Sequence, residues 1–257
     1  MKLIDTHTHL YLSQFNNDID SVIKNAIDSG VTKMLLPNID STTTKQMLSL
    51  SKKYPENCFP MIGLHPCSVK EETMYKEILH VEEMLKKENF LAIGEIGLDL
   101  HWDKSTLEIQ KQAFEDQINL AKKYKLPIVI HVRESFEEAI EIVEKLNNND
   151  LTGVFHCFTG DYQDAQRVIN LKDFYLGIGG VVTFKNGDLD KMINKISLNH
   201  IMLETDAPYL TPTPYRGSRN ESKYILDIAQ KISNIYDIDL EKIAEVTTKN
   251  ANKLFQL

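Results

Sequence analysis

The chain has 257 residues, of which 42% are hydrophobic and 26% are charged, and its formal net charge is −8. Length and composition are those of an ordinary globular protein, so we expect one domain over residues 1–257. The net negative charge argues against a protein that coats nucleic acid through a basic face, although it does not exclude a phosphate-ester substrate. No apolar run approaches the length of a membrane span, so we expect no membrane association.

The cysteines indicate the cellular setting. Cys58, Cys67 and Cys157 form no CxxC pair and are odd in number, which favours a reduced environment. A strand-like segment begins at residue 2, which leaves no room for a removable signal peptide. We therefore expect a cytoplasmic protein, and no feature of the sequence indicates an obligate protein partner.

Strand-like and helix-like segments alternate along the whole chain. Between the strand-like runs, apolar residues recur at helical spacing, as in Ile109, Ala113, Phe114, Ile118 and Ala121. This alternation predicts consecutive βα units with a parallel sheet, and eight units close a TIM (β/α)8 barrel. The stretch 180–190 fits this scheme least well, and 222–255 is expected to form two closing helices. The predicted strands are 2–6, 32–36, 58–64, 90–95, 127–131, 152–156, 174–178 and 200–204.

Residues that can bind metal follow several of these strands. Imidazole nitrogens and carboxylate oxygens together suit Zn, Mn, Fe or related divalent metals. Barrel active sites lie at the C-terminal ends of the strands, where such side chains would converge. Side chains alternate faces along a strand, so we expect Leu3, Asp5, His7 and His9 on one side, and Leu91, Ile93 and Glu95 likewise. The candidate ligands are His7, His9, Glu95, His131, His156 and Asp206.

Two of these carboxylates are the catalytic candidates. Glu95 has two oxygens and can bridge two ions. Asp206 can bind one ion and also accept the proton of a bridging water, because a metal lowers the pKa of bound water towards neutrality. The alternatives are a structural ion pair for Glu95 and a surface or capping role for the His7 and His9 pair. The whole set favours a metal-dependent hydrolase.

Six motifs in order resemble the TatD family of metal-dependent deoxyribonucleases, which are amidohydrolase-type TIM barrels. The resemblance spans nearly the full chain and implies two metal ions, with His7, His9, Glu95 and Asp206 on one, and Glu95, His131 and His156 on the other. It also implies hydrolysis of DNA phosphodiester bonds. The motifs are Asp5-Thr6-His7-Thr8-His9-Leu10, Gly63-Leu64-His65-Pro66, Gly94-Glu95-Ile96-Gly97-Leu98-Asp99, Pro127-Ile128-Val129-Ile130-His131-Val132-Arg133, Val154-Phe155-His156-Cys157-Phe158 and Leu203-Glu204-Thr205-Asp206-Ala207-Pro208-Tyr209-Leu210.

Four further residues are candidates for substrate binding. His65 either donates to a phosphate oxygen or supports the ligands. Arg133 either neutralises substrate or pairs with Glu204 below the metals. Arg216 and Arg219 lie in a Pro-rich loop after the eighth strand, where barrels often bind phosphate, although solvated loop arginines are the alternative.

Two nearby residues are weaker candidates. Asp99 is a candidate for orienting a ligand histidine. His101, beside Trp102, either stacks on a base or has a plain packing role.

The sequence as a whole favours a two-metal hydrolase that cleaves DNA, from single-stranded or frayed ends and in the 3′-to-5′ direction. The metals could be Zn, Mn, Mg or similar ions. One alternative is an esterase or amidase on the same scaffold, such as an aminoacyl-tRNA deacylase. Another is a metal-binding protein that has lost catalysis, which the intact ligand set argues against.

Overall fold

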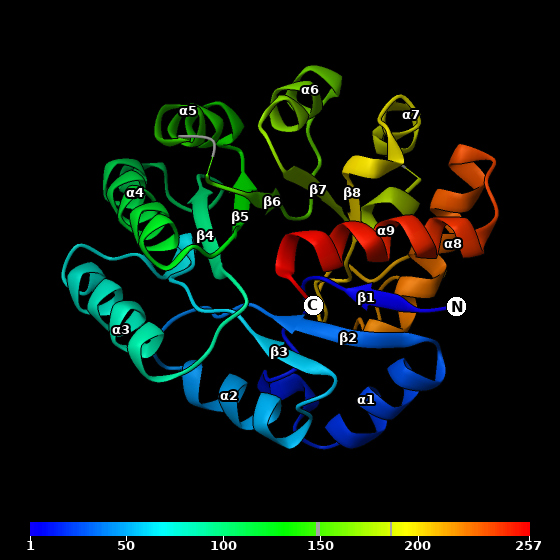
Figure 1. Cartoon of the computed structure of the whole chain (residues 1–257), viewed down its shortest axis with the longest axis horizontal. Helices are drawn as coiled ribbons and strands as arrows, with labels where there is room; N and C mark the ends of the chain where they lie inside the picture. The colour runs from blue at the N-terminus through cyan, green and yellow to red at the C-terminus, as the bar shows by residue number, and fades with distance from the viewer. Residues whose placement is uncertain (148–149, 186) are drawn as a thin grey trace.

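The computed structural model describes residues 1–147, 150–185 and 187–257. Helices surround a central set of strands, as Figure 1 shows. The strands are β1 (Leu3–Asp5), β2 (Val31–Leu36), β3 (Cys58–Pro60), β4 (Ile93–Asp99), β5 (Ile128–Arg133), β6 (Gly153–Phe155), β7 (Phe174–Ile178) and β8 (Ile201–Leu203). The helices are α1 (Ile19–Asp28), α2 (Thr44–Lys53), α3 (Met74–Lys87), α4 (Leu107–Tyr124), α5 (Phe136–Leu146), α6 (Tyr162–Asn170), α7 (Leu189–Ile193), α8 (Ile225–Tyr236) and α9 (Leu240–Phe255).

The strands close into a ring through two short contacts. Parallel pairing runs in the orders β1-β2-β3 and β4-β5-β6-β7-β8. The bridge between Ile62 and Ile93 joins β3 to β4, and the bridge between Thr8 and Ala207 joins the segments that follow β1 and β8. Neighbouring strands in sequence are thus neighbours in space all the way round. This arrangement confirms the predicted TIM (β/α)8 fold.

The centre of the ring is filled by one layer of apolar side chains. Every strand, or the residue next to it, contributes one member. Ala251, Leu254 and Phe255 of α9 pack against this layer and cover one end of the ring. The opposite end of the ring, at the C-terminal ends of the strands, is therefore the end at which a functional site can lie. The layer consists of Ile4, Leu35, Met61, Ala92, Val129, Val154, Tyr175 and Met202.

The predicted alternation of faces is wrong on two strands. Ile4 belongs to the central layer whereas Leu3 packs in the outer core under the helices, so strict alternation would turn His7 outward. The strand instead ends at Asp5, and a bend at Thr6 and His7 redirects the chain.

On β4 the register with β5 shifts between Ile93 and Ile96, so Ile93 faces the outer core although Glu95 does not. The alternation does hold on β5 and β6, where Val129 and Val154 belong to the central layer and the histidines two residues later lie in the site.

The C-terminal ends of β3 and β4 differ most from the prediction. β4 continues to Asp99 because Ile96–Asp99 pairs with Ile130–Arg133, so Glu95 lies within the strand and not at its end. β3 ends at Pro60, earlier than the predicted residue 64. Within the uncertain stretch 180–190, a 3-10 turn covers Gly180–Thr183 and α7 follows, while residue 186 lies outside the described residues. Among the described residues, no helix combines the length and apolar character needed to cross a membrane.

Phe255 tests the role of α9 as the cover of the barrel end. Phe255→Ala should lower the free energy of unfolding by about 3–5 kcal/mol, because it empties a buried aromatic site. Tyr75→Ala is the control, since Tyr75 is 71% exposed and its removal should change that free energy by less than about 0.5 kcal/mol. Urea unfolding followed by circular dichroism measures both, and equal stability of the two variants would contradict the assignment.

Candidate metal centre

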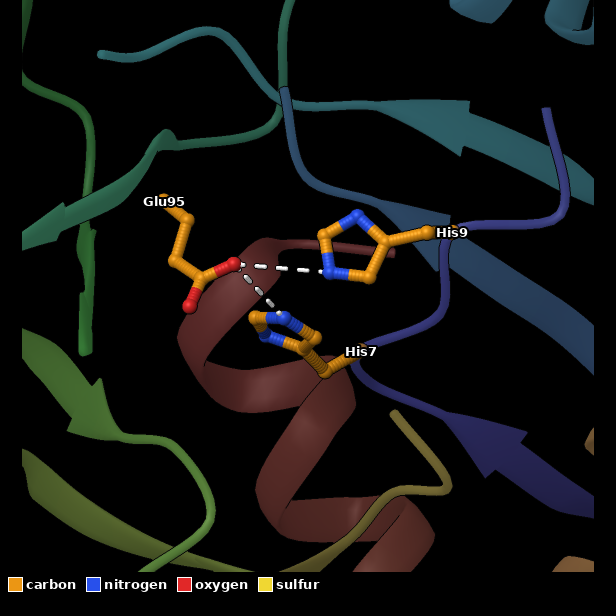
Figure 2. Close-up of side chains that lie close together, drawn as sticks. All are labelled: His7, His9 and Glu95. Atoms are coloured by element: carbon orange, nitrogen blue, oxygen red, sulfur yellow. Dashed lines mark hydrogen bonds and ion pairs between the residues drawn. The ribbon is translucent and has the colours of Figure 1, made fainter. Parts of the chain in front are cut away.

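The carboxylate of Glu95 lies between two sets of histidines. Its Oε2 is 3.1 Å from His7 Nε2 and 3.4 Å from His9 Nε2, as Figure 2 shows. Its Oε1 is 2.8 Å from both His131 Nδ1 and His156 Nε2. Each oxygen of one side chain thus faces its own pair of imidazole nitrogens, and the two pairs adjoin where the rings of His7 and His156 stack with a centroid distance of 3.9 Å.

Asp206 completes the first set. Its Oδ1 is 3.4 Å from His9 Nε2 and 3.8 Å from His7 Nε2. The backbone N–H of Asp206 donates to the carbonyl of His7 at 2.8 Å, which ties the segment after β8 to the segment after β1. The Asp206 side chain is 14% exposed whereas that of Glu95 is 3% exposed, so Asp206 is the more solvent-accessible of the two carboxylates.

Tyr11 determines which ring nitrogen of a neutral His9 carries the proton. The Tyr11 hydroxyl donates to the carbonyl of Pro37 at 2.6 Å, and this uses its single proton. Its oxygen can therefore only accept from His9 Nδ1, which lies 3.0 Å away. With the proton on Nδ1, a neutral His9 presents the Nε2 lone pair to the space beside Glu95 and Asp206. Sequence reasoning missed Tyr11, although its position two residues after His9 was a usable signal.

Asp99 determines in the same way which ring nitrogen of His131 carries the proton. The Nε2–H of His131 donates to Asp99 Oδ2 at 2.9 Å, which leaves Nδ1 free to face Glu95. Burial alone would raise the pKa of Asp99, but the hydrogen bond from His131 lowers that pKa to about 2. Asp99 therefore orients His131 by this hydrogen bond, whereas metal binding by His131 stays a prediction.

Glu204 lies beneath the candidate ligands, where it was predicted only as a possible partner of Arg133. It is fully buried, its Oε1 is 3.5 Å from His156 Nδ1, and it accepts the backbone N–H of Cys157. A Cβ at Gly177 would overlap Glu204 Oε2, so a larger residue there would displace the carboxylate. Within the described residues, Glu204 Oε2 and the Nδ1 atoms of His7 and His156 have no hydrogen-bond partner. The carboxylate is placed to attract the outer N–H groups of two ligands.

The predicted pairing of Glu204 with Arg133 is wrong. The Arg133 guanidinium lies 5.5 Å from the ring centroid of Trp102. Arg133 is the last residue of β5 and is exposed, whereas Glu204 is buried at the level of the histidines. Two further residues of β5 beyond His131 carry Arg133 away from the buried carboxylate.

The pKa values of the site residues indicate that the site can bind cations. Burial alone would raise the pKa of Glu95, but His156, His65 and His7 outweigh burial and hold that pKa well below its usual range. Burial likewise would lower the pKa of His9, but hydrogen bonds to Asp206 and Glu95 raise it to about 10. The pKa of His156 is also raised, because Glu95 and Glu204 outweigh its burial. In the metal-free protein, protons lie between the histidine nitrogens and the carboxylate oxygens. Divalent cations would bind to the same atoms in place of these protons, so the residues fit a metal centre.

His65 adjoins the second set of ligands but presents a proton to it. The backbone N–H of Cys67 donates to His65 Nδ1 at 3.0 Å, so the proton of a neutral ring is on Nε2. That Nε2 lies 3.3 Å from Glu95 Oε1. His65 is therefore a hydrogen-bond donor in the site, although its residue type alone would also suit a metal ligand.

The two loop arginines have partners of their own. Arg219 pairs with Asp18 at 2.7 Å and with Glu221 at 3.0 Å. Arg216 donates to the carbonyl of Thr211 at 3.1 Å, and its guanidinium lies 3.9 Å from the ring centroid of Phe184. Their predicted contact with substrate phosphate stays a prediction. The loop itself borders the site, since the ring of Tyr209 lies 6.3 Å from that of His9.

Metal binding should weaken as the pH falls. The pKa values of His9, His131 and His156 are raised in the metal-free protein, so a cation must displace their protons. Affinity for Zn²⁺ or Mn²⁺ should therefore rise from pH 6 towards pH 9, with protons released on binding. Calorimetric titration in buffers of different ionisation enthalpy measures both quantities. Binding that is independent of pH and releases no protons would contradict this ligand set.

Comparisons with known proteins show the family to which the chain belongs. The family model described as TatD related DNase matches residues 4–256. The chain is 37% identical over 256 residues to the uncharacterized metal-dependent hydrolase YabD of Bacillus subtilis, with 99% of each protein covered. It is 31% identical to the 3′-5′ ssDNA/RNA exonuclease TatD of Erwinia tasmaniensis, over 99% of this chain and 100% of that protein.

A solved structure shows the same likeness. The crystal structure of YJJV, a TatD homolog from Escherichia coli, matches with a TM-score of 0.90 and 27% identity, over 99% of this chain and 98% of that one. The resemblance inferred from the six motifs is thereby confirmed. The chain belongs to the TatD-related family of metal-dependent hydrolases.

Proposed function

We propose that the chain binds two divalent ions and hydrolyses DNA phosphodiester bonds, removing nucleotides from the 3′ end in the cytoplasm. The observation that carries the proposal is the placement of Glu95, whose two oxygens face separate ligand sets. Bound divalent ions at such a centre lower the pKa of water and neutralise charge on a phosphoryl group. The name of the relative from Erwinia tasmaniensis, a 3′-5′ ssDNA/RNA exonuclease, supports the substrate class.

Asp206 is the proton acceptor in this proposal. Burial would raise the pKa of Asp206, but its hydrogen bond to His9 outweighs burial and lowers that pKa, so the carboxylate is ionised at neutral pH. It is also more exposed than Glu95, which places it towards an attacking water. Glu95 has the complementary role of holding the two ligand sets at a fixed separation.

His65 is the donor to the substrate. Its Nε2–H points to the side of Glu95 that faces His131 and His156. A non-bridging phosphate oxygen bound there would accept this hydrogen bond, and the donor needs no change of protonation to make it. His65 thereby complements the proton acceptor Asp206 on the opposite side of Glu95.

The depth of the site favours a strand end as substrate. The side chains of its ligands are between 0% and 16% exposed, so the reacting atoms lie below the rim. Duplex DNA is stiff over about 150 base pairs, whereas a single strand bends and can enter a recess. The site thus fits single-stranded or frayed ends better than an uninterrupted duplex.

The direct test offers purified, metal-loaded protein several substrates beside one another. We expect release of mononucleotides from the 3′ end of labelled single-stranded DNA, with two divalent ions per chain by elemental analysis. Aminoacyl-tRNA should remain intact. Nicking of closed duplex circles without mononucleotide release, or deacylation of tRNA without DNA cleavage, would contradict the proposal.

Variants separate the catalytic step from phosphate binding. Asp206→Asn should lower kcat on single-stranded DNA by about 10²–10⁴-fold, because it removes a proton acceptor. If Arg216 holds phosphate, Arg216→Ala should raise KM more than it lowers kcat, with an effect that shrinks at high salt. Arg219→Ala is the comparison, because Arg219 is already paired with two carboxylates. Steady-state kinetics at low salt measure these effects. An unchanged KM in both arginine variants would show that the loop does not bind substrate phosphate.

A further inference from the structure

The single tryptophan of the chain is exposed in the loop that follows β4. Trp102 is 74% exposed, although indole is among the side chains that gain most from burial. It comes three residues after Asp99, whose carboxylate holds His131. An exposed indole this close in sequence to the metal centre calls for a partner other than the protein core.

Neighbouring side chains hold the indole in place. The His101 ring lies against it with a centroid distance of 4.9 Å and an interplanar angle of 81°. His101 Nδ1 is in turn 2.6 Å from Glu134 Oε1. The guanidinium of Arg133 lies 5.5 Å from the indole centroid. The ring is therefore positioned by its neighbours while most of its surface remains available.

A cleft beside this position reaches the candidate metal centre, although Trp102 itself is not part of its lining. It has a volume of about 520 Å³, and its lining includes the metal-ligand candidate His156 together with Phe136, Phe158, His101 and Arg133. Arg133 thus both lines the cleft and contacts Trp102. It lies two residues beyond His131 on β5, which corresponds to about 7 Å along the strand. A single nucleoside can span that distance.

Arg133 also has free hydrogen-bond donors. The chain has four arginines. Arg167 and Arg219 form ion pairs with carboxylates, and Arg216 donates to a backbone carbonyl. Within the described part of the chain, the guanidinium of Arg133 makes no hydrogen bond or ion pair. Its donors are therefore free to bind an anion at the rim of the cleft.

We propose that Trp102 and Arg133 form a nucleotide subsite, in which a base next to the scissile bond stacks on Trp102 and its phosphate binds Arg133. This inference rests on the proposed nuclease function. Every base has a π-face, so stacking on an aromatic ring tolerates all sequences, as trimming of a strand requires. Planar arginine donors match a phosphate. In this proposal Trp102 binds the base, and the metal centre hydrolyses the phosphodiester bond.

The single tryptophan gives a direct binding signal. Metal-loaded protein is titrated with a short oligothymidylate whose phosphorothioate linkages slow hydrolysis, and with an abasic oligonucleotide of the same length and linkage. Stacking predicts that oligothymidylate quenches the Trp102 fluorescence and that the abasic strand leaves it unchanged. Equal signals from the two strands would overturn base recognition at Trp102.

Variants extend the test to affinity. By anisotropy of dye-labelled strands, Trp102→Leu should weaken oligothymidylate binding about tenfold or more and leave abasic binding unchanged. Trp102→Tyr keeps an aromatic face and should restore most of the affinity. Tyr75→Leu removes another exposed aromatic side chain, on α3, and should have no effect. On cleavable single-stranded DNA, Trp102→Leu should raise KM more than it lowers kcat.

The outcomes separate this inference from the function on which it rests. If the wild-type protein trims DNA but Trp102→Leu binds both strands as the wild type does, the subsite is wrong and the nuclease function stands. If Trp102→Tyr is as weak as Trp102→Leu, stacking is not the interaction and the subsite is again wrong. If the wild-type protein neither trims DNA nor binds either strand, both proposals fail together.

Discussion

One buried carboxylate sets the geometry of the whole active face. Glu95 is 2% exposed, and burying an ionised carboxylate is costly unless cations or donors surround it. Its backbone is fixed as well as its side chain. The Glu95 N–H donates to the carbonyl of Asn38 at 3.1 Å, and the Asn38 N–H donates to the carbonyl of Gly94 at 3.1 Å. A Cβ at Gly94 would lie 2.6 Å from Val129 Cβ, so β4 and β5 approach closely only because this residue is glycine.

The barrel supplies what that carboxylate needs from distant parts of the chain. His7, His131 and His156 follow or lie on different strands, and only a closed ring brings all three to one carboxylate. The central apolar layer and α9 close the opposite end. The polar site and the apolar core are thereby separated along the barrel axis, so the ligands need not compete with core packing.

The clustering of the candidate ligands could be predicted because their residue types and positions after apolar runs are local features of the sequence. The residues that hold the candidate ligands in place were harder to predict. Glu204 and Asn38 act on residues that are remote in sequence, and no local pattern distinguishes them from ordinary core or turn residues. The alternation of faces failed on β1 and β4 because a bend and a register shift move His7 and Glu95 to the inner side. Strand periodicity assumes regular strands, and active-site strands depart from it where a side chain must be redirected.

The charge distribution links substrate binding to metal binding. The formal net charge is −8, and Glu95, Asp206, Asp99 and Glu204 all lie in or beneath the site. A phosphate approaching these carboxylates alone would be repelled. Arg133 contributes one positive charge at the rim of the cleft. In the proposed two-metal site, divalent ions held by the two ligand sets would reverse the local field. By reciprocal linkage, ions that favour a bound phosphate are themselves held more tightly when the phosphate is present. In the proposed nuclease, phosphate and metal ions would therefore bind cooperatively.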